Sequence, residues 1–246
     1  MSLSPRYTYH LTERSAQVHR RRRDEHNECK RVLVEWASGR AGAGGVVDVC
    51  CGKGGDVYKW RGRCARYFGI DHSSPAVAEA RARAASAGLG AATFAVGDAA
   101  AGPPLPPCGV VSCMFGLHYF KPGARLNALL DRVAAALHEG GVFVGITVDD
   151  RALPPHLGDT YTYELPGLID PTKEHRLPFA ALERAAAERC LHLCFERTVE
   201  RFLRGARRAS TCPENRCYLV FAFVKMAPPP NARAEARAAP KHPTPA

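Results

Sequence analysis

Residues 46–60, "VVDVCCGKGGDVYKW", carry the pattern that decides the fold. The apolar run at 46–50 predicts a buried strand, a glycine-rich loop follows it, and "DVYKW" at 56–60 opens a helix. In α/β folds, the loop after the first strand brings its backbone close to a ligand beyond the carboxyl ends of the strands. Structural tight turns use the same glycines, so the loop by itself indicates a nucleotide site only weakly.

Strands and helices alternate along the rest of the chain. A helix precedes the loop, with apolar residues at helical spacing: Val32, Leu33, Trp36 and Ala37. The strands expected after the loop are 66–71, 92–98, 109–116 and 142–148, and the helices between them are 74–88 and 124–141. A helix at 178–190 and strand-like segments at 192–200 and 217–225 follow a less regular stretch. The sequence therefore predicts an α/β doubly wound, mostly parallel seven-stranded sheet that ends in a C-terminal antiparallel hairpin.

One core should hold most of this chain, because it has 246 residues of which 46% are hydrophobic. We expect a basic arm at residues 1–24 and the folded domain at 25–226. The segment 227–246 is rich in proline and alanine and has almost no large apolar residues, which predicts disorder.

The charge of the chain favours an anionic partner. The formal net charge is +10 and the pI is about 9.3, which for an intracellular protein indicates nucleic acid or a nucleotide. The run Arg20–Arg23 fits either a solvated helix face or a segment that contacts phosphate or directs nuclear import. We expect an intracellular protein with no membrane span, no secretory signal and no DNA partner.

The ten cysteines predict neither disulfides nor a metal site. A chain of this size needs no disulfide staples, and reduced thiols are the expected state inside a cell. The nearest pairs, Cys190 with Cys194 and Cys212 with Cys217, lack the C-x2-C spacing of structural zinc sites.

Two acids indicate which nucleotide the loop would bind. Asp71 ends the second strand about twenty residues beyond the loop, where a carboxylate can accept from ribose hydroxyls of either NAD or S-adenosylmethionine. Asp98 ends the third strand, where it could reach an adenine edge or serve only as a turn or helix-capping carboxylate. The position of Asp98 and the terminal hairpin are typical of class I methyltransferases. Cys50 stands at the first glycine position of the G-x-G-x-x-G pattern, which counts against NAD.

At this point the resemblance to a family becomes specific. Residues 46–60 closely resemble the first motif of messenger RNA cap guanine-N7 methyltransferases, roughly LDLGCGKGGDLLKW. The segments "SCMFGLHYF", "LHEGGVFVGIT" and "CYLVFAFVK" resemble that family's SCQFxxHYxF, LSPGGYFIGTT and YLVFAFEK. "HNECKRVLVEWA" is similar to its NNWxKxxLI helix, and "KEHRLPFAALERAAAE" to the segment whose glutamate meets guanine. The matches stand in order and cover about residues 26–225.

The resemblance implies a Rossmann-like fold, S-adenosylmethionine as methyl donor and no metal. It places the cofactor on Lys30, on the backbone at Cys50 and Gly52, and on Asp71, Asp98, Met114 and Tyr119. The physical chemistry of the charged residues agrees, because the ammonium of Lys30 can pair with the methionine carboxylate of the cofactor.

The resemblance implies that the cap binds through His26, Asn27, Lys53, Lys59, Arg83, His118, Glu174 and Tyr218. Cations suit the triphosphate bridge, although Arg83 in "EARARAA" also fits a solvated helix face. Glu174 can accept from N1 and N2 of guanine and thereby select it over adenine. His118 would contact guanine, at O6 for example, and Tyr218 would flank the base; without the motif context each would be a core residue.

The reaction needs no general base. Guanine N7 has a free lone pair and can attack the sulfonium methyl group directly in line. We therefore expect His118, Tyr119 and Glu174 to position the base, and near-attack alignment to supply on the order of 7 to 11 kcal/mol of the barrier.

The sequence departs from the family pattern at three positions. Cys50 replaces a glycine, Met114 a glutamine, and His26 the first asparagine of NNWxK. Cysteine suits a glycine position only if the backbone torsion there is ordinary. Two alternatives stay open: a class I methyltransferase with another acceptor, and a cap-binding or scaffold subunit without turnover.

The expected partner is a capped RNA, with the GpppN end made by other capping enzymes, since triphosphatase and guanylyltransferase domains have no room here. An activating subunit is an open alternative, because some family members use one. The composition is compatible with a large DNA virus or a unicellular eukaryote. The nucleus is the expected compartment in a cell, and the host cytoplasm or the replication site in a virus.

Overall fold

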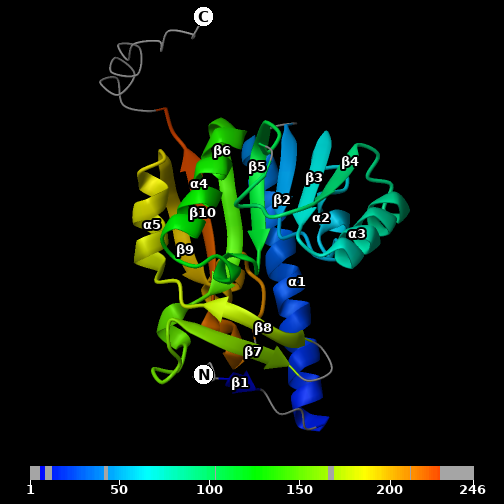
Figure 1. Cartoon of the computed structure of the whole chain (residues 1–246). Coiled ribbons are helices and arrows are strands. Elements are labelled where there is room, and N and C mark those ends of the chain that lie inside the picture. Colours follow the sequence, from blue (N-terminus) through cyan, green and yellow to red (C-terminus); the bar gives the residue numbers. More distant parts are fainter. Residues whose placement is uncertain are drawn as a thin grey trace, which may run out of the picture.

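A seven-stranded sheet forms the centre of the computed structural model, which describes residues 6–8, 13–41, 44–102, 104–165, 169–210 and 212–227 (Figure 1). The strand order is β4-β3-β2-β5-β6-β10-β9. The strands are β2 (Gly45–Val49), β3 (Arg66–Asp71), β4 (Ala92–Val96), β5 (Cys108–Met114), β6 (Leu137–Val148), β9 (Leu191–Thr198) and β10 (Tyr218–Lys225). β2 to β6 are parallel, whereas β10 runs antiparallel to both β6 and β9. The predicted doubly wound fold is confirmed.

Helices cover both faces of the sheet. They are α1 (Glu13–Ala41), α2 (Val57–Trp60), α3 (Ser74–Ser86), α4 (Ala124–Ala136), α5 (Phe179–Ala187) and α6 (Val199–Gly205). Successive strand residues face opposite sides, so Val110 joins the core under α1 and α6 while Val111 joins the core under α4 and α5. All seven residues of β5 are buried, which explains why its sequence does not alternate between apolar and exposed polar residues.

The chain changes direction across the sheet between β2 and β5. β3 and β4 lie on one side of β2, and β5 and β6 on the other. In open α/β sheets, ligands bind beyond the carboxyl ends of the strands at such a change of direction.

A second, smaller sheet lies at this carboxyl edge (Figure 1). It consists of β1 (Arg6–Thr8), β7 (Thr160–Leu165) and β8 (Ile169–His175), with β1 parallel and β8 antiparallel to β7. Sequence analysis gave this region no strands. The small sheet contacts η1, the short 3-10 helix at Leu117–Tyr119 that follows β5.

The N-terminal segment differs from the arm expected at residues 1–24. Residues 6–8 pair with β7, and α1 begins at Glu13 and continues to Ala41. The arginine run is thus helical, as one of its two interpretations assumed. The expected disordered tail, 227–246, lies outside the described residues except for Ala227.

Two other element boundaries differ from expectation. The helix expected over 124–141 ends at Ala136, because Leu137 already pairs with Cys108 in the sheet and Gly140 adopts a positive φ of 80° at the adjoining irregularity. The expected terminal hairpin is an antiparallel pair, β9 and β10, whose connection contains α6 and a 3-10 helix, η3 (Pro213–Cys217).

The described residues contain neither a candidate membrane-spanning helix nor a candidate metal site. None of the helices there is long and apolar enough to span a membrane, and no group of three or more histidine, cysteine, aspartate or glutamate side chains is arranged to hold a metal ion.

Candidate functional site

The glycine-rich loop after β2 is held in place by Asp71 at the end of β3. The amide of Gly52 donates to Oδ2 of Asp71 at 2.9 Å, and the amide of Ser73 donates to Oδ1 at 2.9 Å. The amide of Cys51 donates to the carbonyl of Ile70 at 3.1 Å. Asp71, at the carboxyl end of β3, is 9% exposed and so still reaches solvent. Each carboxylate oxygen keeps a second lone pair for a ligand hydroxyl.

The glycines of this loop have two different roles. A Cβ at Gly54, where φ is +70°, would lie 2.9 Å from the Cα of Ala80, so this glycine allows close packing on α3. At Gly52 and Gly55 an added Cβ would have no atom within 4 Å. The loop is therefore fixed on one side and open on the other. A glycine loop that is open on one side, next to a carboxylate that can accept from ribose hydroxyls, fits the amino-acid and nucleoside parts of S-adenosylmethionine.

Cysteine was expected to suit position 50 only if the backbone torsion there is ordinary, and the torsion of Cys50 is not. Its φ is +57°, in the left-handed region that favours glycine. A Cβ at Gly116, just after β5, would lie 2.7 Å from the Cβ of Cys50 and 2.9 Å from the Sγ of Cys113. The side chain of Cys50 is thus accommodated by the missing side chain at Gly116.

Asp98 follows β4 and already has two partners. Its Oδ1 accepts from the amide of Ala100 at 2.9 Å, and its Oδ2 pairs with Arg125 at 2.9 Å. The first contact is the turn role that the sequence left open. The side chain is 33% exposed, so an adenine could still approach it. Contact of Asp98 with adenine stays a prediction.

Lys30, Asn27 and Lys59 form one cluster around Asp56, which links α1 to the start of α2. Lys30 Nζ lies 2.8 Å from Oδ2 of Asp56, and Lys59 Nζ lies 2.9 Å from Oδ1. Lys59 also donates to Oδ1 of Asn27 at 3.2 Å. Burial would raise the pKa of Asp56, but the charges of Lys30 and Lys59 outweigh it and hold that pKa below its ordinary value. The cluster carries one net positive charge.

Lys53 and Arg83, both expected to contact phosphate, meet at Glu79 of α3. Lys53 Nζ lies 3.4 Å from Oε2 of Glu79, and Arg83 donates to Oε1 of the same carboxylate. Lys53 is 69% exposed, so this ion pair is weak and a phosphate can compete for it. Sequence analysis did not identify Glu79.

The small sheet and η1 bring the side chains of Tyr161, Glu174 and His118 together. Glu174 of β8 accepts from the hydroxyl of Tyr161 of β7 at 2.9 Å, and its Oε1 lies 3.5 Å from Nε2 of His118. Glu174 is 5% exposed and His118 is 4% exposed. The ring of Tyr119 lies 4.5 Å from that of His118 and is 37% exposed. His118 and Glu174 are more than fifty residues apart in the sequence, and the packing of β8 on η1 brings them together.

Burial governs protonation in this pair. It raises the pKa of Glu174 to about 7 and lowers the pKa of His118 to about 4. His118 is therefore a neutral imidazole at neutral pH. Glu174 loses its proton near pH 7, where it gains the capacity to accept from two N–H groups of a base.

An aromatic cluster lies beside this pair. The rings of His26, Phe115 and Tyr218 lie 4.7 to 5.3 Å apart, and Lys30 Nζ lies 5.3 Å from the centre of the Phe115 ring. Burial and the nearby Arg22 lower the pKa of His26 to about 3, so this ring is neutral too. Nε2 of His26 and Nδ1 of His118 are buried without a hydrogen-bond partner among the described residues. Such atoms are available to a bound base.

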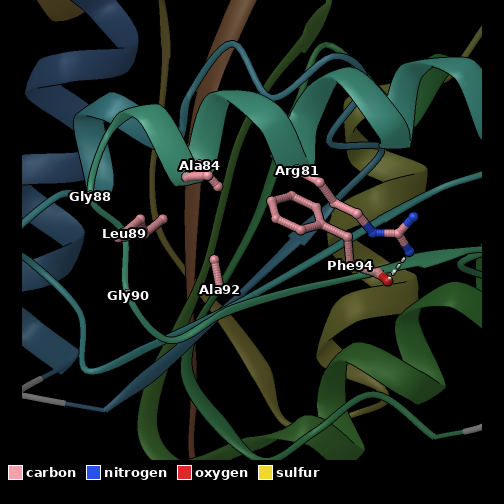
Figure 2. A pocket seen from close by; sticks show the side chains of 8 residues that line it. Arg81, Ala84, Gly88, Leu89, Gly90, Ala92 and Phe94 are labelled. Atoms are coloured by element: carbon pink, nitrogen blue, oxygen red, sulfur yellow. Dashed lines mark hydrogen bonds between the residues drawn. The ribbon is translucent and has the colours of Figure 1, made fainter.

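The other predicted site residue is Met114, the last residue of β5, which is buried and packs in the core under α1. A surface pocket of about 240 Å³ lies elsewhere, between the end of α3 and β4 (Figure 2). Arg81 lies at one end of the pocket and donates to the carbonyl of Phe94 at 2.8 Å. None of the predicted site residues lines this pocket.

Asp48 and Tyr161 were not identified from the sequence as residues that support the site. Asp48 is buried in β2, accepts from the hydroxyls of Tyr67 at 2.5 Å and Ser112 at 2.6 Å, and has a pKa raised to about 6 by burial and then by the charge of Asp56. An acid within an apolar strand was the available signal for Asp48. For Tyr161, the alternation "TYTYEL" was a strand signal.

The fold defines the class of protein. The structure of the N-methyltransferase NodS from Bradyrhizobium japonicum in complex with S-adenosyl-L-homocysteine superimposes with a TM-score of 0.59 at 15% identity. The match covers 82% of this chain and 86% of that one. Together with the loop and Asp71, this likeness gives the chain the fold of S-adenosylmethionine-dependent methyltransferases.

The family follows from the sequence comparisons. The model of the mRNA (guanine-N(7))-methyltransferase domain matches residues 10–153, and the chain belongs to this family. It is 28% identical to the mRNA cap guanine-N(7) methyltransferase of Lodderomyces elongisporus over 68% of this chain, and 30% identical to mRNA cap guanine-N(7) methyltransferase 1 of Arabidopsis thaliana over 56%. The chain spans 42% of the length of each of these relatives.

Proposed function

We propose that this protein transfers a methyl group from S-adenosylmethionine to N7 of the 5′ guanosine cap of RNA, converting GpppN to m7GpppN. One observation carries the proposal beyond membership of the family. A glycine loop tied to Asp71 and a buried Glu174–His118 pair, from distant parts of the chain, meet at the same edge of the sheet. The first unit suits a nucleoside donor and the second a purine acceptor.

The donor would lie between the loops after β2 and β5. S-adenosylmethionine supplies a methyl group on a positively charged sulfur, which a neutral nucleophile can attack. The backbone at Cys50 and Gly52 and the carboxylate of Asp71 would hold its methionine and ribose parts. Lys30 would take the carboxylate of the donor, and Asp98 the adenine; both would then share their present partners with the ligand.

The guanine would lie among the aromatic rings and Glu174. An ionised Glu174 accepts from N1 and N2 of guanine, whereas adenine offers no matching pair of donors. The hydroxyl of Tyr161 donates to Oε2 of Glu174 and thereby fixes the plane of the carboxylate. His118, neutral and with a free Nδ1, can contact the base without adding charge.

The triphosphate bridge would lie along the start of α2. Lys53 and Arg83, which now pair with Glu79, would also bind phosphate oxygens. Lys59 would bind phosphate too, because the cluster around Asp56 has one positive charge more than Asp56 neutralises. Spread phosphate charge suits several cations at moderate distance.

No side chain has to remove a proton from the acceptor, because N7 of guanine carries none. The residues act by binding, orientation and exclusion of water. Fixing N7 in line with the methyl carbon and the sulfur supplies on the order of 7 to 11 kcal/mol of the barrier. The buried setting of His118 and Glu174 keeps their contacts strong.

Capped RNA is the proposed partner, with the GpppN end supplied by the other capping enzymes. The nucleus is the proposed compartment of a cellular protein, and the replication site that of a viral one.

A comparison of acceptors tests the proposal. With labelled S-adenosylmethionine, GpppA should accept methyl groups and ApppA should not, because only guanine matches Glu174. Transfer to both dinucleotides alike would favour another acceptor class. Binding of S-adenosylmethionine and GpppA without transfer would favour the cap-binding subunit. The left-handed backbone of Cys50 and the methionine at position 114, where the family has glutamine, support that alternative.

A further inference from the structure

The first half of α1 carries cations that the cap site does not use. The helix extends past the carboxyl ends of the central strands (Figure 1), so its first half lies beyond the edge of the central sheet. Arg20 and Arg23 are exposed, and neither makes an ion pair within the part of the chain that the structure describes. They continue a line formed by Asn27 and Lys30, at intervals of three and four residues.

The contacts of Asn27 and Lys30 establish which way this line faces. Asn27 and Lys30 contact Lys59 and Asp56 at the start of α2, so their side of α1 faces the expected triphosphate. His26, one position away on the helix, turns inward to Phe115. On the opposite flank, Glu25 accepts from Ser210.

Two acids of α1 face away from this line. Glu25 and Glu28 are both engaged with the segment 208–215 on the opposite flank. Asp24 is exposed and lies four residues after Arg20 and three before Asn27, so it borders this line. The line defined by Arg20, Arg23, Asn27 and Lys30 is named here the α1 basic line. Its three cations outnumber the one bordering acid, Asp24, so it presents net positive charge on the same side as the cap site.

We propose that the α1 basic line binds the RNA chain beyond the cap. This inference rests on the proposed function, since it deepens the account of the substrate. Ten residues of helix separate Lys30 from Arg20, which is about 15 Å along the axis. A single strand that leaves the triphosphate beside Lys59 would follow this line outward, and its phosphates would pair with Arg20 and Arg23. The contacts go to the backbone, so they carry no base preference.

Two substrates separate this role from the cap site. One is the dinucleotide GpppA, and the other is GpppA-capped single-stranded RNA of about ten nucleotides. The variant is Arg20→Ala with Arg23→Ala. The control is Arg184→Ala with Arg201→Ala, which removes two exposed arginines from α5 and α6. Urea unfolding of each variant checks that the fold is intact.

The expected result is selective. The α1 variant should methylate GpppA within twofold of the unaltered protein, while its kcat/KM for capped RNA falls at least about fivefold at low salt. The dependence of log affinity for capped RNA on log salt should become less steep by about 1.4, the value for two lost phosphate contacts on a single strand. The control variant should match the unaltered protein on both substrates.

Each other outcome decides against a specific claim. Equal losses with GpppA and with capped RNA would assign the arginines to the cap site or the fold and overturn the inference. An unchanged salt slope would make the line a solvated helix face and also overturn it. If the unaltered protein methylates neither substrate, the proposed function fails first, and the inference fails with it.

Discussion

Replacement of Glu174 by glutamine should change stability and function in opposite directions. Glu174 is 5% exposed, and burial raises its pKa from 4.5 to about 7. Between these two pH values the unfolded chain has lost the proton and the folded chain keeps it. Stability therefore falls as pH rises from 4.5 to 7 and stays at the lower level above pH 7.

The size of the effect follows from the same shift. At 1.36 kcal/mol per pKa unit, the ionised carboxylate costs the folded state about 3 kcal/mol above pH 7. Glutamine avoids this cost, keeps the shape of the side chain, and can still accept from Tyr161. Glu174→Gln should thus raise the free energy of unfolding by up to about 3 kcal/mol at pH 8, and by little at pH 4.5.

Urea unfolding at the two pH values measures this difference. Glu183→Gln, on the exposed side of α5, is the matched control and should leave stability unchanged at both. A Glu174→Gln variant that is no more stable than the unaltered protein at pH 8, or that gains equally at both pH values, would refute the assignment of a raised pKa to this buried carboxylate.

The same variant should lose activity. A neutral amide cannot accept two N–H groups of guanine, so kcat/KM for GpppA should fall about ten- to a hundredfold. In the unaltered protein, guanine affinity should increase as pH rises from 6 to 8, because binding needs the ionised form of Glu174. Affinity that is flat over this range would separate Glu174 from guanine.

Other predictions concern the donor side. Asp71→Ala should weaken S-adenosylmethionine binding at least about tenfold in calorimetry while GpppA affinity changes little; equal weakening of both would contradict its role at the ribose. Gly116→Ala should lower the free energy of unfolding by about 1 to 3 kcal/mol through its clash with Cys50, and adding Cys50→Gly should restore most of it; additive losses in this double-mutant cycle would exclude the contact. Asp56→Asn should cost about 3 kcal/mol in urea unfolding, because Lys30 and Lys59 lose their shared counterion, and a loss below about 1 kcal/mol would refute that arrangement.

The central sheet could be predicted from the sequence because its signals are local. Buried parallel strands such as "VVDV" and "GVVSCM" are continuous apolar runs, and glycine or a serine–proline pair marks the neighbouring turns. Ser73 does accept from the amide of Ala76 at the start of α3.

The small sheet could not be predicted in the same way. β8 contains Asp170, Pro171 and Lys173, which disfavour a strand in isolation, and it forms only because it pairs with β7. The start of α1 was missed for a related reason. Its first turns are polar on most sides, so they lack the apolar period that identified Val32 to Ala37.

Residue types in the site were easier to predict than their partners. The positions of Asp71 and Glu174 follow from motifs, but the sequence does not show that Asp56 holds both Lys30 and Lys59. Nor does it show that Cys50 has a left-handed backbone. Such pairings depend on side chains that meet only after the strands have assembled.

The measurement that tests the central claim most directly is the position of the transferred methyl group. Purified protein, labelled S-adenosylmethionine and GpppA-capped RNA would be incubated together, and the product would be digested with nuclease and separated. The account predicts that the label appears in 7-methylguanosine. Label at any other position, or no transfer although both ligands bind, would contradict it.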